Sequence, residues 1–412
     1  MVLMATLLAP LGVAQRGPTT LAANEQTARQ AAPPAKPRYT ITDLGTLGGS
    51  SSVAFGINDK GQVVGYSNIN PQILHAYLWD DGTMTDLGTL GGQTSAAFDI
   101  NDAGQVVGWT ADNSIETTRA FLWQNGVMQD LGTLGGEGSS AHGINSAGQV
   151  VGSARFTDRF YRAFLWQNGA MQNLGTFGLN SDATDINDAG QVVGRSSYPL
   201  PTASVHAFLW QGGPLQDLGH LGGDFSRAEA INEAGQVVGS SFLSDGGPHA
   251  FLWQNGAMQD LGTLGGPSSY AYDINDDGQV VGESGYRAFL WEDGQMQDLN
   301  GLIPTGSGWV LREAYGINNK GKIVGYGVIG GKNRAFLLTP LPPWTLIFYL
   351  DGDNNLASTY PAIIQQLQSA ATNPNVNIVA LWDSSGFGDS AYYKFNAASV
   401  DLTLQGELDM SN

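Results

Sequence analysis

Short apolar runs alternate with polar turn sequences over most of the chain, and their order repeats. Between Ala271 and Leu299 the runs AYDI, QVVGE, RAFLW and QMQDL are separated by NDDG, a variable loop and EDG. Asn-Gly and Asp-Gly pairs favour hairpin turns, because both residue types accept the positive φ that such turns require. No run has the length or the period of a helix. The pattern therefore predicts four short β-strands per unit.

The unit recurs seven times. An Ile-Asn pair marks each copy at intervals of 42 to 45 residues, and a glycine follows three positions later; the asparagines are Asn58, Asn101, Asn145, Asn187, Asn232, Asn275 and Asn318. Four strands in about 43 residues is typical of a β-propeller blade. We predict an all-β, seven-bladed propeller over residues 38–340, in which the repeated Asn and Gly are turn residues.

The two ends of the repeat complement each other. The seventh unit ends at Arg334–Pro340 without a fourth strand, whereas the stretch Tyr39–Leu44 is such a strand with no unit of its own. Pairing the two would leave no open sheet edge. We expect the N-terminal strand to close the last blade.

Composition narrows the possible partners. The net charge is −19, with 18 Lys and Arg against 37 Asp and Glu, so cations that could neutralise phosphates are scarce. This predicts no nucleic-acid partner. The chain has no cysteine, which excludes a thiol nucleophile, disulfides and Cys-based metal sites within it. No stretch is long and apolar enough to span a bilayer.

The first 37 residues differ from the repeat. Residues 1–14 form an apolar segment ending in small residues, which predicts a signal peptide and secretion to the extracellular space. Residues 15–37 are small, polar and proline-rich, which is typical of a disordered linker.

The repeat also resembles a known family. The recurring pieces DLGTLGG, INDAGQVVG and AFLWQNG are similar to the HAF repeat of extracellular bacterial proteins, in register over about residues 38–340. The resemblance implies a secreted propeller-like repeat and no defined activity.

One basic position recurs in every unit, directly before the A-F/Y-L run: His75, Arg119, Arg162, His206, His249, Arg287 and Arg334. These seven residues, the basic ring, are candidates for binding an anion or a protein. Alternatively, each cation pairs with the carboxylate of a DLG sequence. Histidine replaces arginine in this position, which argues against a zinc cluster, so no metal is expected. The variable loops after VVG are further candidates for binding. No unit shows an unrepeated carboxylate pair that would indicate a hydrolase.

A different pattern begins at residue 343. Trp344–Leu350 is a continuous apolar strand, residues 359–371 have helical periodicity, and Val376–Trp382 is a second apolar strand. Strand, helix and strand predict the start of a parallel α/β domain. Asp351 and Asp383 then fall at the carboxyl ends of the two strands, where such sheets bind ligands. The alternative is that both are turn residues.

This segment has a resemblance of its own. WTLIFYLDGDNNL and NVNIVALWDSSG are similar to the opening of clostripain-like cysteine peptidases, which have a caspase-like α/β fold. The resemblance implies that residues 343–412 are an incomplete peptidase domain. The family's catalytic His and Cys come from later strands, so no catalytic residue is assigned here and this chain is expected to be inactive.

Two main functions remain open. The chain is a binding module joined to the start of a peptidase, or a purely non-catalytic adhesion or ligand-binding propeller; a propeller enzyme is a third alternative. The expected partner is an extracellular protein, peptide or glycan. No cofactor is expected, and the chain is expected to be a monomer.

Overall fold

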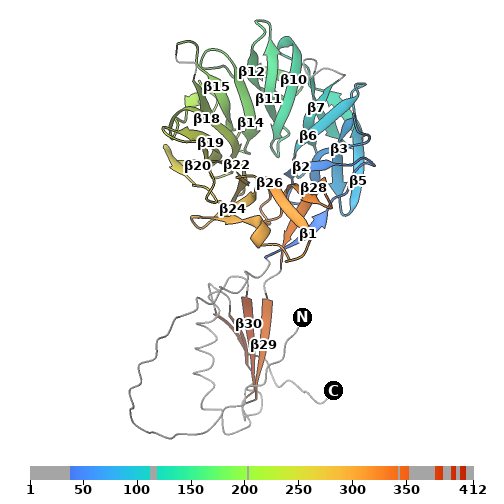
Figure 1. The fold of residues 1–412 in the computed structure, drawn as a ribbon, viewed down its shortest axis with the longest axis vertical. Helices are drawn as coiled ribbons and strands as arrows, with labels where there is room; N and C mark the ends of the chain where they lie inside the picture. The colour runs from blue at the N-terminus through green and yellow to red at the C-terminus, as the bar shows by residue number, and fades with distance from the viewer. Residues whose placement is uncertain are drawn as a thin grey trace. The chain divides into compact units, whose positions relative to one another are not determined.

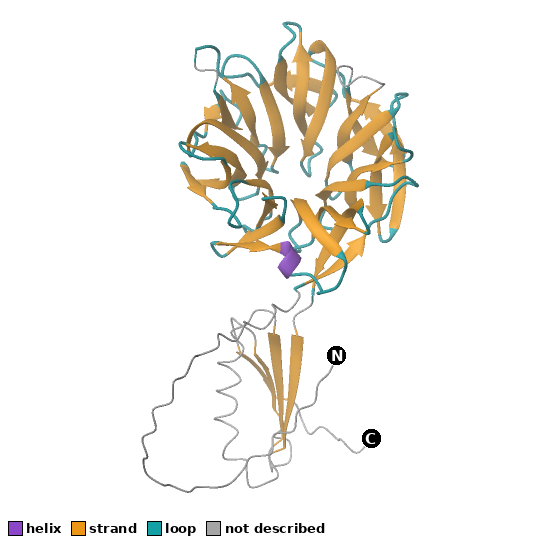
Figure 2. Cartoon of the chain, in the orientation of Figure 1, coloured by secondary structure: helices purple, strands orange, loops and turns teal. Residues whose placement is uncertain are grey.

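The computed structural model of the protein describes residues 38–111, 118–201 and 204–341, together with the backbone of four strands between residues 344 and 404. The chain divides at residue 341 into two compact parts, the repeat and a C-terminal part. Strands make up most of the described residues, which contain one helical turn, the 3-10 helix Leu299–Gly301 (Figure 2). No helix among the described residues has the length and apolar character needed to cross a membrane.

The predicted strands are present in every unit. The first two units contain β2 (Ser52–Ile57), β3 (Val63–Asn68), β4 (Leu74–Asp80), β5 (Thr83–Gly88), β6 (Thr94–Ile100), β7 (Val106–Ala111), β8 (Arg119–Gln124) and β9 (Val127–Asp130). The next two contain β10 (Gly135–Ile144), β11 (Val150–Phe156), β12 (Tyr161–Gln167), β13 (Ala170–Asn173), β14 (Ser181–Ile186), β15 (Val192–Ser197), β16 (Val205–Trp210) and β17 (Gln216–Asp217). The last three contain β18 (Gly222–Ile231), β19 (Val237–Leu243), β20 (Pro248–Gln254), β21 (Ala257–Asp260), β22 (Ser269–Ile274), β23 (Val280–Ser284), β24 (Ala288–Glu292), β25 (Gln295–Asp298), β26 (Trp309–Ile317), β27 (Ile323–Ile329) and β28 (Lys332–Pro340).

These strands pair into antiparallel sheets in chain order. Five sheets have four strands, and an eight-stranded sheet joins β14–β17 to β18–β21 through one parallel pair, Val205 with Phe225. The sheets surround a common centre (Figure 1). The first strands of successive units contact one another, and β26 contacts β2 in turn. The fold is therefore all-β and β-propeller-like.

The prediction of closure by the N-terminal strand is confirmed. Strand β1 (Tyr39–Asp43) pairs antiparallel with β28, with Tyr39 opposite Pro340. It is the outer strand of the sheet β1-β28-β27-β26, so the two ends of the repeat meet in one sheet. Every hydrogen bond of this pairing joins residues about 300 positions apart.

Aromatic and branched side chains fill the space between neighbouring sheets. Phe208 and Trp210 of β16 pack against Val151 and Leu165 of the preceding unit, and the other units repeat this arrangement. Close packing requires the glycine of each VVG sequence: a Cβ at Gly194 would lie 2.0 Å from the Asp182 carbonyl oxygen. Burial of the aromatic residues supplies much of the stability of such a ring.

The repeated asparagines do more than form turns. In each unit the Asn side chain accepts from a backbone N–H four residues later, as in Gln191 to Asn187 at 2.9 Å. Its Nδ2 donates to the backbone oxygen of the next unit's asparagine, and Asn318 donates to Asn58 at 2.9 Å. The asparagines are thus linked in a closed circle around the centre.

The C-terminal part of the chain contains a small four-stranded sheet. Strands β29 (Trp344–Asp351) and β30 (Val376–Asp383) are parallel, and β31 (Ala391–Phe395) and β32 (Val400–Leu404) follow antiparallel. The parallel pairing of β29 with β30 is as predicted for these two strands. The predicted helix at residues 359–371 lies outside the described residues.

Candidate functional site in the central cavity

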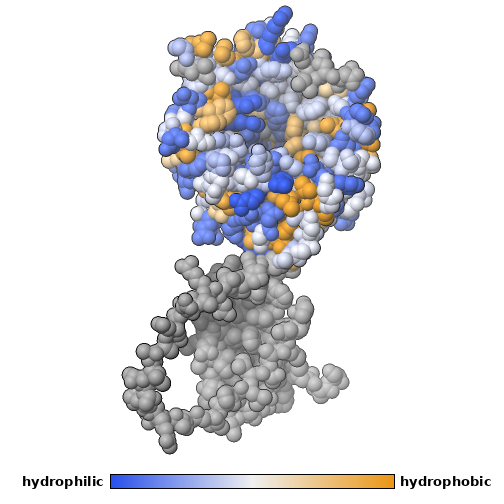
Figure 3. Space-filling model, in the orientation of Figure 1, coloured by the Kyte–Doolittle hydropathy of each residue, from blue (hydrophilic) through white to orange (hydrophobic). Residues whose placement is uncertain are grey.

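A cavity of about 510 Å³ opens at the centre of the ring, where first strands converge. Figure 3 shows this face of the molecule hollowed near the middle of the ring. One position of each unit, three residues before the repeated asparagine, lines the cavity: Phe55, Phe98, His142, Thr184, Glu229, Tyr272 and Tyr315. We call these seven residues the cavity ring. The side chains differ around the ring, whereas the asparagines beneath them are identical.

One half of the cavity is charged. His142 Nδ1 on β10 lies 3.2 Å from Asp182 Oδ1 on β14, and Arg195 lies 3.4 Å from the other oxygen of Asp182. On β18, Arg227 Nε lies 2.7 Å from Glu229 Oε1. The side chains of His142, Asp182 and Glu229 are 24%, 18% and 14% exposed, whereas those of their partners Arg195 and Arg227 are 40% and 36% exposed.

Burial and the ion pairs together shift the pKa values of His142, Asp182 and Glu229 in different directions. Burial disfavours charged His142, but the Asp182 carboxylate and the Ala183 carbonyl outweigh it and raise the His142 pKa. Burial also opposes ionisation of Asp182, yet His142 and the arginines hold its pKa well below the usual range. At Glu229 burial prevails over Arg227 and raises the pKa to about 7. The charged half thus holds an ionised Asp182 near a Glu229 that titrates near neutral pH.

The other half of the cavity is aromatic. The Phe55 ring lies 5.2 Å from Phe98 and 4.9 Å from Tyr315, and Tyr272 lies 5.0 Å from Tyr315, in tilted arrangements. The Tyr315 hydroxyl donates to Glu313 at 2.5 Å, and Tyr326 donates to its other oxygen at 3.0 Å. The aromatic side chains therefore present both ring surfaces and fixed polar groups.

Three buried aspartates link alternate units at the edge of the cavity. Asp185 accepts from its neighbour Ile186 N at 2.7 Å and from Ile231 N of the next unit at 2.8 Å. Asp99 and Asp273 make the same pair of contacts. Burial raises the pKa of all three, that of Asp185 to about 7, with Asp99 contributing. The other four units carry Gly56, Gly143, Ala230 and Gly316 at this position, and a Cβ added at any of the three glycines would lie 3.0 Å or less from a backbone atom of a neighbouring unit.

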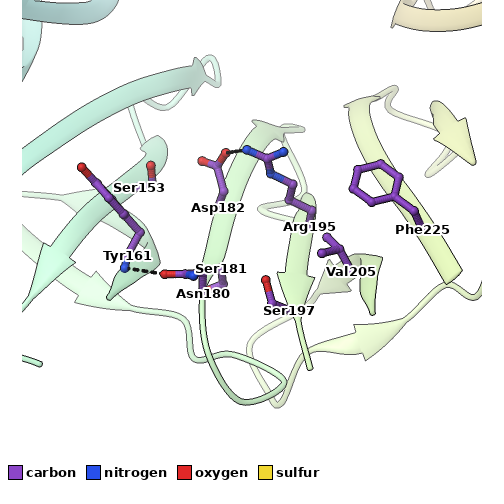
Figure 4. A pocket seen from close by; sticks show the side chains of 9 residues that line it. All are labelled: Ser153, Tyr161, Asn180, Ser181, Asp182, Arg195, Ser197, Val205 and Phe225. Atoms are coloured by element: carbon purple, nitrogen blue, oxygen red, sulfur yellow. Dashed lines mark hydrogen bonds and ion pairs between the residues drawn. The ribbon is translucent and has the colours of Figure 1, made fainter. Parts of the chain in front are cut away.

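A second hollow of about 420 Å³ adjoins the charged half. In Figure 4, Asp182 and Arg195 face each other from β14 and β15, with the Phe225 ring of β18 on the right, Tyr161 on the left and Asn180 below Asp182. Asp182 lines both hollows. A ligand in the central cavity could therefore extend towards this second one.

The basic ring has a largely structural explanation. His75, His206 and His249 contact the DLG carboxylates Asp86, Asp217 and Asp260 at 2.8 to 2.9 Å, and Arg287 contacts Asp298 at 3.1 Å. In the third unit the DLG position is Asn173, and Arg162 pairs with Asp158 instead. Asp86, Asp217 and Asp260 also accept from a glycine N–H two residues on, and Asp298 accepts from Asn300 N–H in the same way. Arg119 and Arg334 form no ion pair with a described carboxylate.

Asp351 and Asp383 are paired in register at the ends of β29 and β30. This is the backbone placement that the sequence predicts. A ligand site at this edge remains a prediction. Among the described residues, no group of three or more His, Asp or Glu side chains is arranged to hold a metal ion.

Sequence reasoning missed the central site. It identified no unrepeated carboxylates, yet Asp182, Glu229 and Glu313 each occupy a position that carries other residue types in most units. The available signal was this variation itself: at three and five residues before the asparagine the units differ, whereas the position between these two is alanine in every unit. Only the ring arrangement shows that the varying positions face one cavity.

Comparison with known proteins leaves the family open. No family model matches the chain, and no curated protein matches it. Solved structures similar to it include the β-propeller domain of the Trilobed protease from Pyrococcus furiosus, with 14% identity, 60% of this chain and 80% of that chain covered, and a TM-score of 0.46. A gluconolactonase from Xanthomonas campestris has 15% identity, 76% and 99% coverage, and a TM-score of 0.36. TolB from Acinetobacter baumannii has 12% identity, 71% and 64% coverage, and a TM-score of 0.41.

Proposed function

We propose that residues 38–340 are a ligand-binding module whose ligand occupies the central cavity. The observation that carries the proposal is the contrast between repeated and varied positions. Residues that build the ring, such as Asn187 and Gly194, have identical counterparts in the other units. The cavity ring instead brings together aromatic, hydroxyl, imidazole and carboxylate groups. Unlike groups converging on one concavity are typical of small-molecule sites.

The size of the cavity supports a small ligand. Its volume of about 510 Å³ lies within the range of roughly 300–1,000 Å³ found for ligand pockets. The ion pairs of His142, Asp182, Arg227 and Glu229 fix the polar groups before a ligand arrives. Such preorganisation lowers the entropic cost of binding.

The repeat offers a substitution that fills the cavity with little risk to folding. Thr184 belongs to the cavity ring, and the equivalent positions of the last two units hold Tyr272 and Tyr315. Thr184→Tyr therefore places a side chain that the repeat already accepts where it occupies ligand space. Gln259→Thr is the matched control, because it is an exposed change that copies Thr85 of the first unit.

The test is a thermal-shift screen of the full chain against sugars, amino acids, dipeptides, nucleosides and organic acids. We expect at least one class to raise the melting temperature of the wild type and of Gln259→Thr but not of Thr184→Tyr. Stabilisation that survives in Thr184→Tyr, or silence across all classes, would refute a ligand site in the cavity.

We also propose that the ring is a seven-bladed propeller of the HAF-repeat type and that the protein is secreted. Support for the blade number comes from the closed circle of asparagine hydrogen bonds and from the single residue pair that joins β16 to β18. Support for secretion comes from the sequence of residues 1–14 and from the HAF-like pieces. Expression with residues 1–14 intact tests the latter: the chain should accumulate outside the cytoplasm with a shortened N-terminus.

For residues 343–412 we propose the beginning of a clostripain-like peptidase domain. The parallel pairing of β29 with β30, which places Asp351 opposite Asp383, supports this proposal together with the sequence resemblance. The 412 residues contain no cysteine, and all five histidines lie in the repeat. Sequencing the gene beyond codon 412 tests this proposal. An apolar strand followed by His and later by Cys would support it. An immediate stop codon would favour the alternative, a non-catalytic adhesion or ligand-binding propeller.

A further inference from the structure

We infer that the ligand of the central cavity is a neutral carbohydrate of one or two sugar rings. This inference rests on the proposed function and names the ligand class for the same site. Three features of the cavity carry it: the internal pairing of its charges, the division into a polar and an aromatic half, and the second hollow beside the charged half.

The carboxylates of Asp182 and Glu229 in the cavity already have cationic partners. Asp182 is held by His142 and Arg195, and Glu229 is held by Arg227 at 2.7 Å. Glu313 accepts hydrogen bonds from Tyr315 and Tyr326. An ionic ligand would have to break one of these pairs and leave the other partner buried without a counter-charge, which is costly. A neutral ligand leaves the pairs intact.

Paired ions still have hydrogen-bonding capacity. A carboxylate has about four acceptor positions and a guanidinium has five N–H donors, of which each pair uses only part. Arg227 and Glu229 therefore offer donors and acceptors side by side at the cavity wall. A sugar hydroxyl donates one hydrogen bond and accepts others, so a row of hydroxyls suits such alternating groups.

The aromatic half matches the other surface of a sugar. A pyranose ring has C–H groups on its faces and hydroxyls around its rim, so it needs an apolar surface opposite a polar one. Phe55, Phe98, Tyr272 and Tyr315 lie on the side of the ring formed by β2, β6, β22 and β26, whereas His142 and Glu229 lie on β10 and β18. The cavity presents both surfaces to one ligand.

Other ligand classes fit less well. An organic anion or phosphate would meet Asp182, Asp185, Glu229 and Asp273, which line the same cavity. A cation would meet Asp182 and Glu229, which already have cationic partners, and Asp99, Asp185 and Asp273, whose oxygens accept backbone N–H groups. The second hollow, which shares Asp182 with the cavity, gives room for a second sugar unit.

The experiment compares neutral sugars with charged sugars of similar size. Binding of glucose, glucuronate and glucosamine, of galactose and N-acetylglucosamine, and of maltose, cellobiose and chitobiose to the full chain is measured by saturation-transfer NMR and calorimetry. Glycylglycine is included as a peptide probe. Wild type, Thr184→Tyr, Glu229→Gln and Gln259→Thr are compared.

We expect at least one neutral sugar to bind the wild type and Gln259→Thr equally. Its charged counterpart should bind at least about tenfold more weakly, since it must disrupt an ion pair. Binding should be lost in Thr184→Tyr and weakened in Glu229→Gln.

Tighter binding of a charged sugar, binding of glycylglycine alone, or no binding by any sugar of the set overturns the inference. If the dipeptide binds and Thr184→Tyr abolishes its binding, the proposed function stands and only the ligand class is wrong.

Discussion

At the scale of the residue, identical and varied positions of the repeat have separate roles. The repeated Asn, Gly and aromatic residues make the same contacts in each unit, such as the Asn187 Nδ2 bond to Asn232 O at 3.1 Å. The varied positions three and five residues earlier on the same strands make contacts that occur once, such as Asp182 with His142. A single strand thus supplies both a ring-building residue and a site residue.

Loss of one repeated asparagine should be costly. Asn187→Ala removes the donor to Asn232 O, which is buried, and the acceptor for Gln191 N, which is partly buried. We expect the free energy of unfolding to fall by about 2–4 kcal/mol. Denaturant unfolding measures it, with Asn173→Asp, which restores the residue of the other units at an outer strand, as a control near wild type. An equal loss in both variants would contradict the assigned role.

The buried aspartates predict a pH dependence of stability. The Asp185 pKa is raised to about 7 by burial and by Asp99, above its unfolded value of about 3.9. The folded state then binds more protons between these values, so this contribution to stability is present below about pH 4 and is lost as pH rises towards 7. Asp99, Asp273 and Glu229 act with the same sign.

Asp185→Asn should flatten this dependence. Between pH 4 and 7 the free energy of unfolding of the variant should fall less than that of the wild type, by on the order of 1–3 kcal/mol. Thermal unfolding at a series of pH values measures it, and Gln259→Thr should follow the wild type. A variant with the wild-type slope would show that Asp185 is ionised in the folded protein.

At the scale of the element, β1 has a role beyond its five residues. It covers the edge of β28, and Leu44 directly after it packs with Ala54, Val324 and Leu337 across the junction of the first and last units. Arg38 also pairs with Glu292 of β24. The strand therefore connects the two ends of the repeat.

Deletion of residues 38–47 should lower the melting temperature strongly, by about 10 °C or more, since an exposed sheet edge and a broken ring junction remain. Differential scanning calorimetry measures the change. A deletion of the same length within residues 15–37 is the control. An unaltered melting curve of the Δ38–47 chain would rule out the closure as a source of stability.

Much of this element structure follows from sequence, because turn chemistry and spacing are local. The INDAG turns, the FLW strands and the unpaired strand at Tyr39–Leu44 predict the sheets and their closure. The pairing of His249 with Asp260 is also foreseeable, since both recur together in the units. The Asp185 contact with Ile231 is not, because the aspartate alternates with glycine or alanine and its partner lies in the next unit.

At the scale of the whole molecule, the ring creates the candidate site. Glu229, Tyr272 and His142 are separated by more than 40 residues from one another along the chain, and no motif joins them. They meet because each stands at the same position of its unit and the units share one centre. Within a single unit, each of these residues is only a departure from the repeat pattern.

The most direct test is a crystal structure of the full chain with the sugar that binds most tightly in the NMR comparison. We predict one sugar ring in the central cavity, with its hydroxyls hydrogen-bonded to Glu229 and Arg227 and its C–H face on Tyr272 or Tyr315. Density for the sugar on the outer loops or along the basic ring, with the cavity empty, would contradict it.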